Sequence, residues 1–113
     1  MPEPYGATVI AQAPPHGEDI ELTFERLAAQ WRDETEHFSF VARRLQHPAY
    51  QQILQLGPGV VPLILREMRQ RPDQWFAALR HLTGEDPVPP GSTVSGAVDA
   101  WLRWGEEKGY LTP

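Results

Sequence analysis

The sequence contains no cysteine, which excludes disulfide bonds, thiolate zinc sites and thiol redox chemistry. Long apolar runs are also missing, since none approaches the roughly 18 consecutive apolar residues that a membrane-spanning helix needs. Residues 1–19, MPEPYGATVIAQAPPHGED, have neither the basic start nor the apolar centre of a secretory signal peptide. We therefore expect a soluble, cytoplasmic protein.

The sequence also lacks the common motifs of enzyme chemistry. It has no HExxH metal-binding pair, no Walker A loop, no GxGxxG turn and no GxSxG nucleophile elbow. One E-x-x-H step, from Glu34 to His37, puts two potential ligands on one helix face, but a di-iron bundle needs a second copy and further carboxylates. We therefore predict a protein that is not an enzyme and binds no metal or cofactor. The histidines are scattered along the chain: His16, His37, His47 and His81.

The residues that are abundant favour a compact bundle of short helices. With 113 residues, 41% of them apolar and 22% charged, the chain suits one globular domain with a single core. Four Trp and four Phe supply bulky side chains for that core. Twelve Pro and nine Gly fall mostly between the apolar patterns, where they stop one helix and allow the next to begin.

Charge is distributed unevenly along the chain, whose net charge is −5. Residues 1–38 carry eight acids and two Arg (−6), residues 39–84 carry two acids and six Arg (+4), and residues 85–113 carry five acids and two bases (−3). The overall acidity argues against non-specific nucleic-acid binding, whereas the Arg-rich middle leaves room for a local anionic contact. The alternative interpretation is that these Arg residues line an ordinary solvated helix surface.

We expect the chain to divide into an extended N-terminal arm, residues 1–18, and a single helical domain, residues 19–113. The arm is rich in Pro and Gly and shows little periodicity. Whether it packs on its own domain, on a partner or on nothing stays open. A first helix follows, capped by Asp19 or Thr23 and ending near Phe38, because its apolar residues recur at spacings of three and four.

A second, short helical segment follows this first helix. Its apolar residues are Phe40, Val41 and Leu45, and we predict that Arg43 and Arg44 point outward. In such an amphipathic segment the charged side chains stay in water and the apolar ones pack on the domain.

The stretch from His47 to Gly84 holds three short helical patterns, separated by Gly57-Pro58-Gly59 and by Arg71-Pro72. Pro48 fits a first helical position, and Gly84 fits a C-terminal stop. Each helix is too short to bury its apolar face alone, so the three must pack together and on their neighbours.

A Pro-rich loop, residues 85–91, precedes the last helix. Ser92 or Thr93 is expected to cap this helix, and Trp104-Gly105 to end it. The following Tyr110-Leu111 pair can fold back as a final anchor.

Parts of the chain resemble known families. LGPGVVPLIL resembles the turn and second-helix start of a HEAT-type helical hairpin, and this resemblance implies a protein-binding scaffold without chemistry of its own. The segments HPAYQQILQLG, WFAALRHLTGEDPVP and WLRWGEEKGYL are similar to a small, uncharacterised bacterial helical domain family, from which no function follows. The expected fold is all-α: a compact bundle of about five short helices, HEAT-like in its middle, with an extended N-terminal arm.

The predicted function is non-enzymatic protein–protein interaction, as a small bacterial adaptor or an antitoxin- or immunity-type inhibitor. The grounds are the missing catalytic motifs, the many aromatic residues and the acidic first helix. The expected partner is another protein or a second copy of the chain. The predicted contact residues are Arg66, Arg69, Trp75, Arg80, Trp104 and Tyr110.

Two alternative functions stay open. A nucleic-acid-associated regulator would use the Arg residues beside Trp75 or Tyr50, a composition that suits phosphate and base contacts. A metal-dependent enzyme would assemble its site from scattered His and Glu. A salt titration separates the first alternative from protein binding, because phosphate contacts weaken steeply as salt rises.

Overall fold

The computed structural model describes residues 17–112, and residues 1–16 and 113 lie outside the described part. The described part forms six α-helices, one short 3₁₀ helix and no strand, which confirms the all-α prediction. The predicted arm, residues 1–18, lies outside the described residues except for its last two, which begin the first helix. The helices are α2 (Gly17–Thr35), α3 (Val41–Leu45), α4 (Pro48–Gln55), η1 (Pro58–Val60), α5 (Val61–Gln70), α6 (Phe76–Thr83) and α7 (Val94–Glu107).

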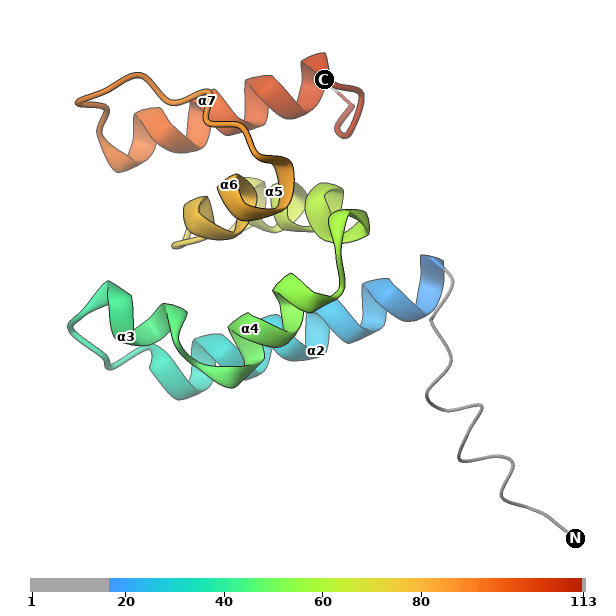
Figure 1. Cartoon of the computed structure of the whole chain (residues 1–113), viewed down its shortest axis with the longest axis vertical. Coiled ribbons are helices and arrows are strands. Elements are labelled where there is room, and N and C mark those ends of the chain that lie inside the picture. The colour runs from blue at the N-terminus through green and yellow to red at the C-terminus, as the bar shows by residue number, and fades with distance from the viewer. Residues whose placement is uncertain (1–16, 113) are drawn as a thin grey trace, which may run out of the picture.

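Figure 1 shows the helices stacked in three layers. α2 and α4 lie side by side in one layer, with α3 between them along the chain, and α4 runs back along α2. α5 and α6 form the middle layer, and α7 packs on α5 from the other side. No helix within residues 17–112 is both long enough and apolar enough to cross a membrane. The HEAT-like character of the middle stays a prediction.

Several helix ends follow from local sequence signals, as predicted. His47 caps α4 by accepting a hydrogen bond through Nδ1 from a backbone N–H in the first turn, at 3.0 Å, and Pro48 occupies that turn. Thr93 caps α7 in the same way through Oγ1, also at 3.0 Å. Gly84 ends α6 in the left-handed conformation with φ = 71°, which a side chain would disfavour.

Three predicted helix bounds are wrong. α2 begins before both expected caps, so Asp19 and Thr23 lie inside it, and it ends at residue 35 rather than near Phe38. α7 continues past Gly105 to residue 107. A glycine inside a helix costs only about 1 kcal/mol, so packing can carry the helix through it.

Gly105 has a packing role, because the chain folds back over it. A Cβ at this position would lie 2.8 Å from Leu65 Cδ1 and 3.1 Å from Leu111 Cδ1. The N–H of Tyr110 donates to the carbonyl of Gly105 at 2.8 Å, and Leu111 is buried. The predicted anchoring of this C-terminal pair is therefore confirmed.

An aromatic cluster forms the centre of the core. Trp75, just before α6, stacks on Tyr50 of α4 with ring centroids 5.6 Å apart and an interplanar angle of 12°. Trp31 and Phe24 of α2 lie 4.8 and 5.7 Å from Trp75. Burial of each side chain of this size is worth about 2–3 kcal/mol, so the cluster ties α2, α4 and α6 together.

Candidate functional site

Trp75 does not lie on the surface, contrary to its place in the predicted contact set. Its side chain is 0% exposed and is surrounded by the rings of the aromatic cluster. A partner cannot touch it without opening the core. Its local sequence pattern, an aromatic residue after a Pro-Asp break, is the same for a buried and an exposed side chain, which is why the sequence alone misplaced it.

The three predicted Arg residues have three different surroundings. Arg66 on α5 forms an ion pair with Glu21 of α2 at 3.1 Å, and both side chains are nearly half exposed. Arg69, also on α5, donates to a backbone carbonyl of the C-terminal segment at 3.1 Å. Arg80 is exposed on α6. No contact within residues 17–112 joins the three side chains, so a shared Arg patch stays a prediction.

Trp104 of α7 and Tyr110, which follows this helix, lie together. Trp104 is buried and donates through Nε1 to the Glu85 carboxylate at 3.2 Å. Tyr110 is 43% exposed and stacks on Trp104 with ring centroids 5.5 Å apart. The pair therefore offers one accessible ring, and both residues stay predicted contact residues. A neighbouring hollow of ≈ 190 Å³ is lined by Pro87, Pro89, Ala100, Arg103, Trp104 and Glu107.

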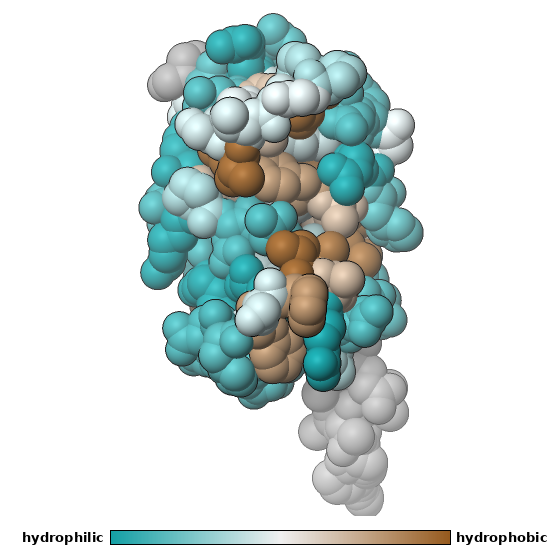
Figure 2. Space-filling view, turned by 90° about the vertical axis from the view of Figure 1, so that its left-hand side faces the viewer, coloured by the Kyte–Doolittle hydropathy of each residue, from teal (hydrophilic) through white to brown (hydrophobic). Residues whose placement is uncertain are grey.

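The most exposed large apolar side chain among the described residues is Phe40, at 70%, and Val41 beside it is 42% exposed. No residue of α3 is buried. Brown and tan atoms lie in both the upper and the lower half of the face drawn in Figure 2, and the lower ones are at about the height of α3 in Figure 1. We call residues 36–43 the α2–α3 corner. It contains a hollow of ≈ 250 Å³ lined by His37, Phe38, Ser39, Phe40 and Arg43.

This arrangement contradicts the sequence prediction for the short helix. Phe40 and Val41, expected to form its apolar packing side, are exposed to solvent. Arg44, expected to point outward, lies inward with its side chain only 15% exposed. Arg43 does point outward, and Leu45 packs against the core, as predicted.

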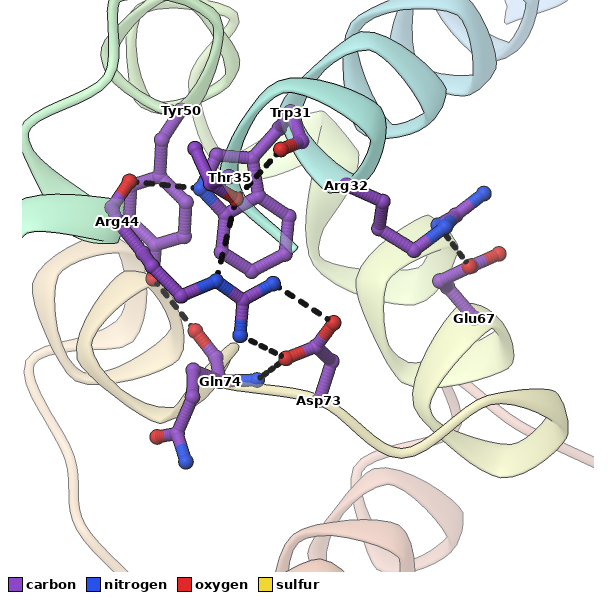
Figure 3. A network of polar contacts seen from close by, with 8 residues as sticks. All are labelled: Trp31, Arg32, Thr35, Arg44, Tyr50, Glu67, Asp73 and Gln74. Atoms are coloured by element: carbon purple, nitrogen blue, oxygen red, sulfur yellow. Dashed lines mark hydrogen bonds and ion pairs between the residues drawn. The ribbon is translucent and has the colours of Figure 1, made fainter. Parts of the chain in front are cut away.

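Arg44 turns inward because three side chains contact its guanidinium: those of Asp73, Thr35 and Trp31. Nη1 and Nη2 donate to the two carboxylate oxygens of Asp73 at 2.8 and 3.2 Å (Figure 3). Nε donates to Thr35 Oγ1 at 3.1 Å, and the guanidinium carbon lies 4.4 Å from the centre of the Trp31 ring. Bidentate pairing with a carboxylate and stacking on an aromatic face are the contacts that offset the desolvation of a guanidinium.

The partners of Arg44 are themselves held in place (Figure 3). Trp31 Nε1 donates to the Arg44 carbonyl at 2.7 Å, and Thr35 Oγ1 donates to the Trp31 carbonyl at 2.6 Å. Asp73 also accepts from the backbone N–H of Gln74 at 2.7 Å. The backbone that carries the α2–α3 corner is therefore fixed both to α2 and to the connection between α5 and α6.

Tyr50 extends this network as a neutral hydrogen-bonding group. Its hydroxyl donates to the Gln74 carbonyl at 3.1 Å and accepts from the N–H of Ala78 at 3.0 Å. Burial raises the pKa of Tyr50 to about 12, because an anion would lose its water. At neutral pH the hydroxyl therefore stays protonated and fastens α4 to α6.

Glu34, from the E-x-x-H step, contacts a histidine other than His37. Its Oε1 lies 2.7 Å from His47 Nε2. Since His47 Nδ1 accepts the capping hydrogen bond, its proton must sit on Nε2, which donates to Glu34. Among the described residues, no three His, Cys, Asp or Glu side chains lie close enough to hold a metal ion.

The α2–α3 corner combines apolar, aromatic and cationic side chains. The Arg43 guanidinium lies 5.6 Å from the centre of the Phe38 ring, and the His37 ring is nearly perpendicular to the same ring, with centroids 5.1 Å apart. Aromatic residues and Arg are enriched in the centres of protein interfaces. The corner is therefore suited to binding an apolar surface, and the sequence signal for it was an aromatic and a β-branched residue beside two Arg.

Comparison with protein-family models, curated proteins and solved structures gave no match for this chain. The resemblances to a HEAT-type hairpin and to a small bacterial helical domain family therefore stay predictions. What the molecule binds has to be inferred from the geometry of its own surface.

Proposed function

We propose that the protein acts by binding another protein through the α2–α3 corner, as an adaptor or an inhibitor. The observation that supports this most is the 70% exposure of Phe40, which directly precedes a helix that Arg44 ties to Trp31 and Asp73 by hydrogen bonds. An exposed apolar side chain gains free energy when a partner covers it, by about 25 cal/mol for each Å² buried.

The chemistry at the rim of the corner supports the same proposal. Arg43 remains exposed beside Phe38, and Arg next to an aromatic ring is a frequent combination in residues that dominate interface energies. The acidic first helix and the Arg-rich middle of the chain, in contrast, partly pair with each other. Arg66 of α5 pairs with Glu21 of α2 at the surface.

The test is affinity capture from an extract of the source cells, at low and at high salt, with the wild type and two variants. Phe40→Ser removes the apolar centre of the corner. Leu22→Ser is the matched control, because Leu22 is 65% exposed on α2 and lies about 20 Å along that helix from the corner. We expect the wild type and Leu22→Ser to retain a stoichiometric protein at high salt, and Phe40→Ser to lose it.

Two results would contradict this proposal. If Phe40→Ser retains the same protein as the wild type, the contact surface lies elsewhere. If the captured material is nucleic acid that leaves at high salt, the Arg-based alternative is favoured, since release of counterions makes phosphate binding steeply salt-dependent.

A further inference from the structure

The segment that contains α3 is held on the rest of the protein mainly through one residue. We call residues 36–46 the α3 segment. No residue of α3 itself is buried, and Leu45 packs against the core but is only partly buried. Within the described part of the chain, every side-chain hydrogen bond from this segment to α2 or to the α5–α6 connection involves Arg44. Little buried apolar surface and few attachments are the features of a segment that opens locally.

Arg44 covers one edge of the aromatic cluster. Its guanidinium lies over the Trp31 ring, and its carbonyl accepts from Trp31 Nε1 at 2.7 Å (Figure 3). Trp31 and Thr35, which also contacts the guanidinium, are both 0% exposed. Removal of the α3 segment would therefore give solvent access to the Trp31 ring and would leave its N–H without an acceptor.

We propose that the α3 segment opens as a unit while the other helices stay folded, and that the Arg44–Asp73 ion pair controls how often it opens. The two side chains of this pair are only 15% and 19% exposed, so water screens their attraction only in part. One residue makes the contacts with Asp73, Thr35 and Trp31, so these contacts are lost together. The open form then presents an aromatic face and a free guanidinium, a combination that is enriched in the centres of protein interfaces.

This inference goes beyond the proposed function, because the segment opens with or without a partner. The two are nevertheless coupled, since Phe40 and Val41 belong to the segment and move with it. A partner that binds the α2–α3 corner in the closed form alone shifts the population toward the closed form, by an amount set by its affinity and concentration.

The first test follows deuterium exchange of the tryptophan indole N–H groups by NMR in the wild-type chain. Trp101 of α7 is the matched control, because its side chain is 0% exposed and its Nε1 lacks a hydrogen-bond partner among the described residues. The Trp31 N–H should exchange at least about tenfold faster than that of Trp101, and its rate should rise less with urea, because local opening exposes less surface than global unfolding. A Trp31 N–H that exchanges no faster than that of Trp101 overturns the inference. It leaves the proposed function intact, because a corner that never opens can still bind a partner.

The second test weakens the ion pair and compares it with a distant contact. Asp73→Asn removes the charge but keeps an oxygen that can accept from the N–H of Gln74, and it should speed exchange at Trp31 about tenfold or more. The control Thr93→Ala removes the cap of α7. It should speed exchange at Trp101 about fivefold, through global unfolding, and leave the rate at Trp31 unchanged. A Trp31 rate that does not respond to Asp73→Asn, or that rises together with Trp101 in Thr93→Ala, overturns the inference.

Discussion

The two sides of α3 contrast in a way that its sequence does not suggest. Its inner side bears Arg44, whose guanidinium pairs with Asp73 and lies on Trp31. Its N-terminal end bears Phe40 and Val41, which are exposed to solvent, and we call this exposed end the outer side of α3. The contrast shows that available partners, rather than polarity alone, decide which side chains are buried in a short helix.

This distribution is favourable because the polar groups of Arg44 on the inner side all have hydrogen-bond partners, whereas Phe40 and Val41 on the outer side have no polar side-chain group that needs one. A buried charge is costly unless it is paired and hydrogen-bonded, and Arg44 meets both conditions. An exposed Phe costs the folded state nothing relative to the unfolded chain, where it is also in water. A side chain that is neutral for folding is free to serve binding.

The largest loss of stability is expected in the aromatic cluster, on which Arg44 of α3 lies. Trp75→Ala should lower the free energy of unfolding by about 3–5 kcal/mol, because it leaves a cavity among Trp31, Tyr50 and Phe24. Denaturant unfolding measures this loss. The control Leu22→Ala should change stability by less than about 0.5 kcal/mol, and equal effects would contradict the burial of Trp75.

A smaller effect is expected at high pH. Burial raises the pKa of Tyr50 from its usual value of 10.0 to about 12, so its folded state holds the proton more tightly than the unfolded state. This contribution is complete below pH 10 and is lost as the pH rises to about 12, which removes about 2–3 kcal/mol of stability. Denaturant unfolding across this range measures it. In Tyr50→Phe this loss of stability should be absent. An equal loss in both proteins would contradict the assignment of this pH dependence to the Tyr50 hydroxyl.

At Arg44 the contrast between the two sides of α3 can be tested directly. Arg44→Ala should cost about 2 kcal/mol, because Asp73 and Thr35 lose their donor, and Arg44→Lys should recover only part of this. Arg43→Ala, one residue earlier and exposed, should cost less than about 0.5 kcal/mol. Equal losses at both positions would remove the distinction between the inner and outer sides.

The smallest of the folding effects is expected at the cap of α4. His47→Ala should cost about 1 kcal/mol, because the first-turn N–H loses its acceptor, and His47→Asn should retain most of the stability. The midpoint of thermal unfolding measures both. Glu34→Gln controls for the exposed contact with His47 and should have little effect. An Asn variant as unstable as the Ala variant would show that capping is not the role of His47.

The accuracy of the sequence predictions depends on how far away the deciding contacts lie. Pro48, Thr93 and Gly84 were placed correctly because the start or the stop of a helix depends on the next few residues only. The inner side of α3 was misassigned because it depends on Asp73, which lies 29 residues from Arg44.

The candidate site was hard to predict for the same reason. Trp75 and Phe40 are both aromatic residues next to a break in the helical pattern, so their surroundings in sequence do not distinguish them. Trp75 is a core residue because α2, α4 and α6 pack around it. No described helix covers Phe40.

The most direct measurement is the free energy of unfolding of Phe40→Ser, determined beside Arg44→Ala at a concentration where the chain is monomeric. We expect Phe40→Ser to unfold within about 0.5 kcal/mol of the wild type, since its side chain is 70% exposed. Arg44→Ala should unfold at clearly lower denaturant. A Phe40→Ser variant as unstable as Arg44→Ala would show that Phe40 serves folding, and would contradict the assignment of the outer side of α3 to binding.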